Sequence, residues 1–535
     1  MRKSLCVIIV LLYVFIYFSS CKDAKNNLPA IAKDVDITLP KQIAPASSNQ
    51  FDSSYTQLFF ARYPKLNTIE QDWLDFYRER NYSFAWADSN GITGAAQNLH
   101  NRINNLSDDG LDDSLLYRQE FNQLYDESLL LGKNELKDSN FILTEMMLSA
   151  QYFMYAHQIY GALSAKELKE LGWNIAPKKI SYYEYLNQVL KDSSKNVFTT
   201  EPVYVQYGLL KDFLKKYKEI EMAGGWPLVD STIKKLKPGD SSLNIPTIKR
   251  RLFISGDITV ADTSNFFDPL MAAAVKQFRI RHGLSDTALI DKYTTSEMNV
   301  PVSKRIEEIL INMERCRWLP YNPGPDYIIV NIPDYRLYVY ENNKVQFSMK
   351  VVVGKEASKT VIFNDTLKII AFSPYWNVPY SIYKNELKGR LTPAYLKRNN
   401  MEVVGEGRVR QLPGKNNSLG LVKFLFPNSY NIYFHDTPAK DRFNFTNRAF
   451  SHGCIRLSEP KRLAEYLLRD EPKYSDKVID SLMHLSKEVQ VRLKKPVPVF
   501  IGYFTAFVNT QSGILNFRKD IYGHDPQVLS WLAKK

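Results

Sequence analysis

A histidine and a cysteine motif near the end of the chain most constrain its fold. His435 ends a β-like run, and Ser451-His452-Gly453-Cys454 follows after fifteen residues, 436–450. A nucleophilic cysteine needs a base that takes its proton and backbone donors that hold the oxyanion formed on the substrate. His435 and Cys454 can supply the base and the nucleophile, and Gly453 lets the backbone approach a substrate without a Cβ. The pattern therefore predicts a cysteine acyl-transfer site.

This spacing resembles the signature of the L,D-transpeptidases with a YkuD-type catalytic domain, which is His, a spacer, Ser/Thr-His-Gly-Cys, a hydrophobic residue and usually Asn. Arg456 stands where Asn is usual, and this departure resembles the long, multi-domain subfamily. Further segments carry the resemblance through about residues 230–525: Val330-Asn331-Ile332-Pro333, Val353-Gly354-Lys355, Asn377-Val378-Pro379, Arg410-Gln411, Leu419-Gly420 and Asp520-Ile521-Tyr522-Gly523.

The resemblance implies that Cys454 attacks the third, diamino residue of a peptidoglycan tetrapeptide stem and expels the terminal D-Ala. An amine of a neighbouring stem would open the thioester and form a 3→3 cross-link. His435 is the expected proton donor and acceptor, Gly453 and Cys454 the backbone oxyanion donors, and His452 a residue that orients the loop. Carbapenems are expected inhibitors, since the family's thiolate attacks their strained carbonyl. The reaction needs no metal and no organic cofactor.

Four further residues are predicted to bind the substrate: Ser451, Arg456, Trp376 and Tyr375. Arg456 can pair with a substrate carboxylate or with an Asp or Glu inside the domain, and the sequence leaves both open. Trp376 and Tyr375 can wall the donor groove, although we expect at least one of them to lie in the core.

Other interpretations compete with this one. A lone Cys is often a small buried hydrophobe. His435, Asp436, His452 and Cys454 are also possible zinc ligands, but two ligands one residue apart are unusual in a structural site. On the same fold, water instead of an amine would give an L,D-carboxypeptidase or an amidase. A non-catalytic wall-binding lipoprotein is an alternative of another class.

The first 21 residues are expected to be an export signal. Arg2 and Lys3 precede an uncharged apolar run that is short for a membrane span. The run ends at Cys21 after two serines, like a bacterial lipobox, so we expect lipidation of Cys21 and a flexible tether over 22–50. An ordinary cleaved signal or a short uncleaved anchor is the alternative. The expected location is the periplasm, with the outer membrane favoured over the inner one.

Composition fits an envelope protein. A chain of 535 residues holds two to four domains, and a net charge of +13 favours anionic partners such as carboxylate-rich peptidoglycan and acidic lipid headgroups. Nucleic acid is not expected as a partner, because no recognised binding motif accompanies the charge. Beyond Cys21, only Cys316 and Cys454 remain, and we expect both to be free thiols.

The predicted fold class is multi-domain α+β, with a helical scaffold domain, a small three-helix domain and a mainly-β catalytic domain with a capping insertion. The expected parts are the signal 1–21, tether 22–50, scaffold 51–227, peptidoglycan-binding-like domain 228–300, linking helix 301–322, catalytic domain 323–508 with capping insertion 381–420, and C-terminal extension 509–535.

The segment 228–300 resembles the type 1 peptidoglycan-binding domain through Phe267-Asp268, Ala274-Val275-Lys276-Gln277-Phe278 and Arg281-His282-Gly283-Leu284. A helical spacer without glycan affinity is the alternative. His282 is expected to be a cation at the C-terminus of a helix.

Overall fold

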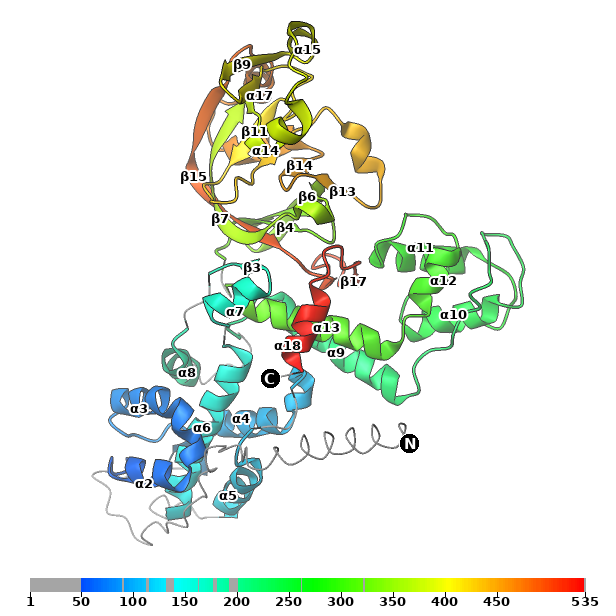
Figure 1. Cartoon of the computed structure of the whole chain (residues 1–535). Coiled ribbons are helices and arrows are strands. Elements are labelled where there is room, and N and C mark those ends of the chain that lie inside the picture. The colour runs from blue at the N-terminus through cyan, green and yellow to red at the C-terminus, as the bar shows by residue number, and fades with distance from the viewer. Residues whose placement is uncertain are drawn as a thin grey trace, which may run out of the picture. The chain divides into compact units, whose positions relative to one another are not determined.

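The computed structural model (Figure 1) describes residues 50–88, 91–111, 115–130, 139–161, 163–176, 180–191, 201–260, 262–320 and 323–533. The predicted signal with Cys21, and the tether except Gln50, lie outside these ranges. The chain divides into two compact units; the first comprises residues up to 103, 114–154 and 182–197, and the second the remainder. Within the described ranges, no helix is long and apolar enough to cross a membrane.

The first unit is helical. It contains α2 (Tyr55–Arg62), η1 (Pro64–Ile69), α3 (Glu70–Glu79), α4 (Gly94–Asn104), α5 (Arg118–Leu130), α6 (Ser139–Ile159), α8 (Tyr182–Lys191) and the ribbon of β1 (Ala87–Asp88) and β2 (Gly91–Ile92). Trp73 and Tyr77 of α3 are fully buried. Their polar atoms donate to Met146 O over 3.1 Å and to the Glu145 carboxylate over 2.7 Å, both on α6. The predicted N-terminal helical region is thus confirmed.

The segment 228–300 of the second unit holds three helices around one apolar core. They are α10 (Ile245–Ile254), α11 (Pro269–Arg281) and α12 (Lys292–Met298). Asp268 caps α11 by accepting from Met271 N, and Asp291 caps α12 in the same way. His282 is buried and its Nδ1 lies 2.8 Å from Phe278 O; burial lowers its pKa well below the ordinary value. The prediction of a cationic His282 is therefore wrong.

The linking helix is α13 (Val302–Trp318), which ends before the predicted residue 322. Leu319 is extended because the residue before a proline, here Pro320, is pushed out of helical conformation. Two more helices of this unit precede it, α7 (Ala165–Glu170) and α9 (Gln206–Met222), with the 3₁₀ segment η2 (Leu106–Asp109).

The catalytic domain is built on a sheet that closes on itself. Its strands are β4 (Tyr327–Asn331), β5 (Arg336–Glu341), β6 (Lys344–Gly354), β7 (Ile362–Phe372), β11 (Val422–Leu425), β12 (Phe434–His435), β13 (Ala449–Ser451), β14 (Ile455–Leu457) and β15 (Val489–Gly502). The order is β11-β12-β14-β6-β5-β4-β15-β7, and β11 also pairs with β7. Side chains that alternate inward along these strands fill the interior. The mainly-β class is thus confirmed.

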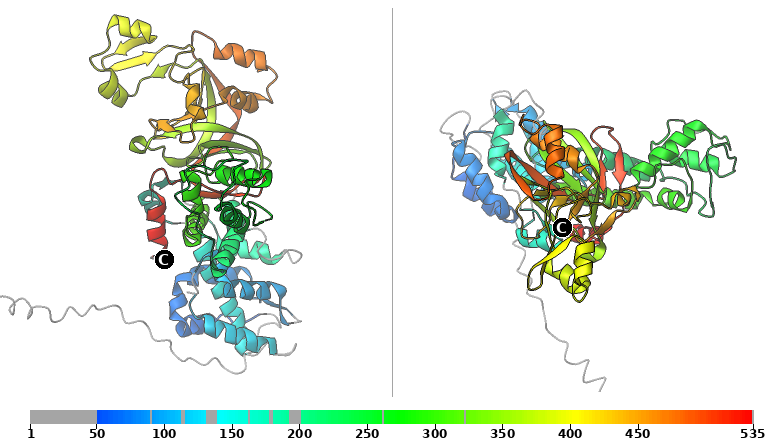
Figure 2. Two further views of the ribbon diagram at one scale, coloured as in Figure 1. Left: turned by 90° about the vertical axis from the view of Figure 1, so that its right-hand side faces the viewer. Right: turned by 90° about the horizontal axis from the view of Figure 1, so that it is seen from above.

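The capping insertion has a sheet and a core of its own. It contains β8 (Trp376–Asn377), α14 (Tyr380–Ile382), the π-helical segment η4 (Tyr383–Leu387), α15 (Pro393–Arg398), β9 (Met401–Gly405) and β10 (Arg408–Gln411). β10 pairs with both β8 and β9, and β8 lies before residue 381, where the insertion was expected to begin. Val378, Leu387 and Val409 form the buried centre. In Figure 2 (left) the insertion stands as a lobe separate from α16 (Pro460–Leu468) and α17 (Asp476–Met483).

Three segments outside the expected catalytic range complete the second unit: β3 (Trp173–Asn174), β17 (Leu515–Phe517) and α18 (Asp525–Leu532). Inside that range lie also β16 (Ala506–Val508) and the short 3₁₀ turns η3 (Glu356–Ser358) and η5 (Lys440–Asn444). β3 pairs parallel to β7, so residues near 173 extend the catalytic sheet. The compact units therefore do not divide at residue 227, where the expected scaffold ends.

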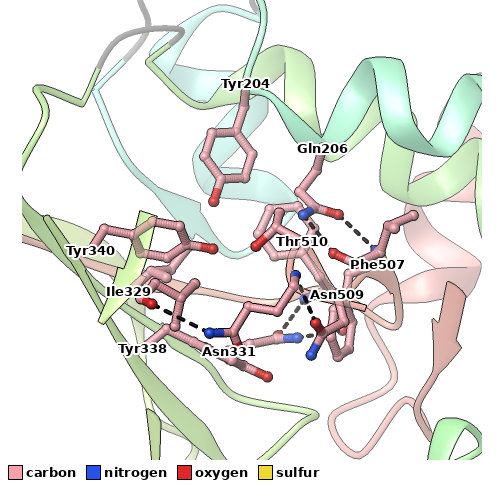
Figure 3. Close-up of a pocket in the computed structure, with 13 residues that line it drawn as sticks. Tyr204, Gln206, Ile329, Asn331, Tyr338, Tyr340, Phe507, Asn509 and Thr510 are labelled. Atoms are coloured by element: carbon pink, nitrogen blue, oxygen red, sulfur yellow. Dashed lines mark hydrogen bonds between the residues drawn. The ribbon is translucent and has the colours of Figure 1, made fainter. Parts of the chain in front are cut away.

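Two buried amides tie neighbouring segments to this domain (Figure 3). Gln206 of α9 donates to Val508 O over 2.8 Å and accepts from Val508 N over 2.7 Å. Asn331 of β4 makes the same double contact with the backbone of Phe504. Each amide satisfies a donor and an acceptor that water cannot reach.

We expect Gln206→Ala to lower the free energy of unfolding of the second unit by about 2–4 kcal/mol, because it leaves the buried N–H and C=O of Val508 unpaired. Gln511→Ala is the matched control, since this amide is exposed and its loss should change little. Urea unfolding of the full chain measures both. Equal stability of the two variants would contradict this account.

Candidate active site

The strand pair β12 and β14 brings the two predicted motifs together. β12 runs parallel to β14, with Phe434 opposite Ile455 and His435 opposite Arg456. Cys454 directly precedes β14. Alternate residues of a strand share a face, and the rings of Tyr433 and His435 accordingly lie 5.7 Å apart. The nucleophile, the expected base and two further polar side chains therefore meet at one end of this pair.

The nucleophile loop, residues 451–454, is a tight turn held by Ser451. The Ser451 hydroxyl donates to Cys454 O over 2.6 Å and accepts from Gly453 N over 3.1 Å. Gly453 has φ +116°, a conformation that residues with a Cβ rarely adopt. The Gly453 N–H was expected to be an oxyanion donor, but in the structure it donates to the Ser451 hydroxyl instead. The Cys454 N–H keeps that predicted role.

The Cys454 thiol lies against the chain that leads into β12. Its Sγ is 3.6 Å from Asn431 O. Burial raises the thiol pKa, and hydrogen bonds from the backbone and the hydroxyl of Tyr433, together with the Arg456 charge, act in the opposite direction. Sequence reasoning missed Tyr433, although its place two residues before His435 on one strand was a usable signal.

His435 is buried and its imidazole has a fixed orientation. Nδ1 lies 2.5 Å from Asp436 O. A carbonyl oxygen only accepts, so Nδ1 carries the proton and Nε2 holds the basic lone pair. Burial, with the charge of Arg456 second, lowers the pKa of His435 to about 3. The ring is therefore neutral over the physiological range, with Nε2 unprotonated.

Burial favours the neutral form of both side chains, the Cys454 thiol and the His435 imidazole. It lifts the pKa of the Cys454 thiol and depresses that of His435. A thiolate–imidazolium pair needs the opposite shifts. The resting site therefore holds a neutral thiol and a neutral imidazole.

Arg456 provides a cation beside the thiol. Its Nε is buried without a hydrogen-bond partner among the described residues. Burial, followed by the charge of Arg442, lowers its pKa. Of the two roles left open by the sequence, these surroundings favour pairing with a carboxylate of the substrate.

His452 contacts the capping insertion. Its Nε2 lies 3.4 Å from Glu386 Oε1 of η4, and both side chains are about half exposed. This contact links the nucleophile loop to the insertion. The predicted role of His452 in orienting the loop stays a prediction.

The rings of Trp376 and Tyr375 contact residues of the capping insertion. Trp376 packs against the apolar centre formed by Val378, Leu387 and Val409. The Tyr375 ring lies under the Arg410 guanidinium at 4.4 Å. These contacts favour the core role for Trp376, and the predicted part of both rings in a donor groove stays a prediction.

The four possible zinc ligands do not form a metal-binding cluster. Within the described ranges, no cluster of three or more His, Cys, Asp or Glu side chains could hold a metal ion. The cavity of Figure 3 also lies elsewhere, lined by residues such as Tyr204, Tyr340 and Thr510. The Gln206 and Asn331 amides on its wall are already bonded to backbone.

Two parts of the chain match known protein families. Residues 325–498 match the family model of the L,D-transpeptidase catalytic domain, YkuD, and residues 71–214 match that of a scaffold domain. A Haemophilus influenzae protein assigned as an L,D-transpeptidase is 30% identical over 269 residues, which cover 44% of this chain and 54% of the relative. The match thus spans about half the length of this curated relative.

Solved structures give a weaker likeness. An L,D-transpeptidase from Mycobacterium smegmatis is 14% identical over 33% of this chain and 58% of that one, with a TM-score of 0.19. L,D-transpeptidase 3 from Mycobacterium tuberculosis, in complex with a faropenem-derived adduct, is 14% identical over 33% and 60%, with a TM-score of 0.18. At these scores the likeness adds nothing to the sequence matches.

We expect Cys454 to react with iodoacetamide more slowly than free cysteine at neutral pH, because its raised pKa leaves less thiolate. The rate should keep rising above about pH 8.5, the ordinary thiol value, and show no step near about pH 6.5, where an ordinary histidine titrates. Peptide mass spectrometry of the Cys454 peptide across pH measures this. A rate that is already flat from acid to neutral pH would indicate a standing thiolate and contradict the neutral pair.

Proposed function

We propose that the protein forms 3→3 cross-links in peptidoglycan through a Cys454 thioester, on the premise that residues 325–498 match the family model of the L,D-transpeptidase catalytic domain. The observation that carries the proposal is the pairing of β12 with β14, which sets the strand of His435 beside the nucleophile loop. Around the thiol stand Tyr433 and Arg456.

The first step would acylate the enzyme. As Cys454 Sγ attacks the carbonyl of the third stem residue, its proton passes to Nε2 of His435, and the C–S bond forms. The Cys454 N–H would stabilise the oxyanion, a contribution of about 3 kcal/mol per donor. The C–N bond to D-Ala then breaks, and the imidazolium returns its proton to the leaving amine. Arg456 would hold a carboxylate of the donor stem.

The second step would release the enzyme. A side-chain amine of a neighbouring stem attacks the thioester, His435 accepts its proton, and the thiol is restored as the new amide forms. Water attacking in place of the amine would give the carboxypeptidase or amidase reaction. The capping insertion, linked to the nucleophile loop through His452 and Glu386, is the part of the domain suited to favour the amine over water.

The proposed setting is the periplasm, with the chain anchored by a lipid on Cys21. A basic chain, with a net charge of +13, is attracted to carboxylate-rich stems and acidic headgroups. The three-helix segment 228–300 would hold the glycan close to the active site. The outer membrane is the favoured location of the anchor.

We expect Cys454→Ala to abolish cross-linking and covalent capture by a carbapenem, because it removes the only nucleophile of the proposed reaction. His435→Ala should acylate slower by about 10²–10⁴, the usual worth of a general base, with a rate that rises with pH as unaided thiolate forms. Intact-protein mass after carbapenem exposure measures acylation, and muropeptide mass spectrometry with disaccharide-tetrapeptide measures the products.

Cys316→Ala is the matched control, since this thiol is buried in the core and should leave acylation unchanged. An adduct on Cys454→Ala would place the nucleophile elsewhere. Cleaved monomers without cross-linked dimers in the presence of excess acceptor would replace the transpeptidase by the hydrolase.

The lipid anchor has its own test. Cys21→Ser should release the chain from membranes or stall its processing, because the thiol that would carry the diacylglyceryl group is gone. Fractionation and mass of the mature N-terminus measure the effect. If the variant fractionates and migrates like the wild type, the lipobox interpretation is wrong.

A further inference from the structure

A second loop supports the nucleophile loop from beneath. This bracing loop, residues 354–360, connects β6 to β7 through η3. Lys355 N donates to Ser451 O over 3.0 Å, and the Ser358 hydroxyl donates to the same oxygen over 3.2 Å. The Thr360 hydroxyl donates to Gly453 O over 2.8 Å. The position of the peptide that follows Gly453 therefore depends on where the bracing loop lies.

The bracing loop is itself closed by Tyr522 from the C-terminal extension. The Tyr522 hydroxyl donates to Gly354 O over 2.6 Å and accepts from Thr360 N over 3.2 Å. It thus joins the two ends of the loop. Lys359 Nζ donates to Tyr522 O over 2.7 Å. Tyr522 is only 3% exposed, so water cannot replace these bonds.

The bracing loop is tightly packed at its start, where the backbone of Gly354 lies against residues 358–360. A Cβ on Gly354 would lie 2.2 Å from Ser358 O and 2.8 Å from Thr360 N. Gly354 N also donates to the Thr360 hydroxyl over 2.9 Å. Backbone this closely packed transmits a displacement to its neighbours instead of absorbing it.

Tyr522 is held in place by residues of the domain's last strands and loops. Its N–H donates to the Tyr503 hydroxyl over 2.8 Å, and the two rings stack with centroids 5.6 Å apart. The Tyr503 hydroxyl in turn donates to Asp520 Oδ1 over 2.5 Å. Asp520 also accepts from His524 N and Asp525 N at the start of α18. The hydroxyl of Tyr522 therefore has one fixed direction.

We propose that Tyr522 is a positioning residue for Cys454, acting through Thr360 and Gly453. It lies beyond the matched catalytic range of 325–498 and touches neither the thiol nor the site of the substrate. Its hydroxyl fixes the bracing loop, the loop fixes the Gly453 carbonyl, and this sets the Cys454 N–H and thiol relative to Tyr433 and His435. The inference rests on the proposed acyl-transfer function.

The test uses Tyr522→Phe, Thr360→Val and Thr360→Ser in the full chain. A misplacement of about 1 Å can cost about 10²-fold in rate, so Tyr522→Phe and Thr360→Val should slow carbapenem acylation by about 10–10²-fold. Thr360→Ser keeps the hydroxyl and should restore most of the rate. In Tyr522→Phe the midpoint of Cys454 alkylation should also move to higher pH, because the thiol loses its alignment with the Tyr433 donors.

Tyr338→Phe is the matched control. The Tyr338 hydroxyl makes a 2.5 Å hydrogen bond to Asp334 in the same domain, so its loss lowers stability without reaching the bracing loop. The inference predicts similar melting temperatures for Tyr338→Phe and Tyr522→Phe but slow acylation only in the second. Acylation and an alkylation profile in Tyr522→Phe equal to those of Tyr338→Phe would overturn it.

The proposed function fails in a different way. If the wild type takes no carbapenem on Cys454, the acyl-transfer proposal is wrong, and alkylation still decides on Tyr522. In that case, an alkylation midpoint that is shifted in Tyr522→Phe and Thr360→Val, but not in Tyr338→Phe or Thr360→Ser, supports the positioning role. An unshifted midpoint rejects it.

Discussion

The parallel pairing of β12 with β14 is the interaction on which the candidate site depends. Parallel strands in register place His435 opposite Arg456, and alternation along each strand then puts Tyr433 with His435 and Cys454 with Arg456. β14 continues into the sheet through β6, and β12 through β11. The closed sheet therefore fixes the strand of His435, the proposed base, beside that of Cys454, the proposed nucleophile, and the residues 436–450 between them hold η5 and the start of β13.

Burial of this strand pair determines the chemistry available at the site. A low-dielectric environment disfavours charge on sulfur and on imidazole alike, which explains why the pKa of Cys454 rises while that of His435 falls to about 3. Arg456 carries a charge beside both, and its Nε has no hydrogen-bond partner within the part of the chain that the structure describes. Once a substrate carboxylate binds, the Arg456 charge would be partly neutralised, and its depression of the His435 pKa would weaken. Substrate binding would thereby make His435 a better proton acceptor.

The sequence predicted what local patterns encode. The motif spacing identified Cys454 and His435 as candidate site residues. Asn342 and Asn343, which join β5 to β6, have the positive φ that a tight hairpin turn requires. The sequence did not predict β15, because Pro496 and Pro498 argue against a strand; a register irregularity between Arg492 and Val497 accommodates the interruption. The strands of the capping insertion were missed because each is short and pairs only within that insertion.

Sequence reasoning could not predict contacts between residues that lie far apart in the chain. Tyr522 stands some seventy residues after Cys454, and although its segment carries part of the family resemblance, nothing in that segment indicates which groups its hydroxyl contacts. Only the folded chain shows its hydroxyl between Gly354 O and Thr360 N. The same holds for the Gly453 N–H, whose bond to Ser451 removes a donor that the motif alone suggested. In the proposed reaction, a turn that satisfies its own Gly453 amide leaves the Cys454 N–H as the motif's other oxyanion donor, and the position of that N–H then matters more. The bracing loop, which Tyr522 of the C-terminal extension closes, meets this requirement by supporting the four-residue nucleophile loop.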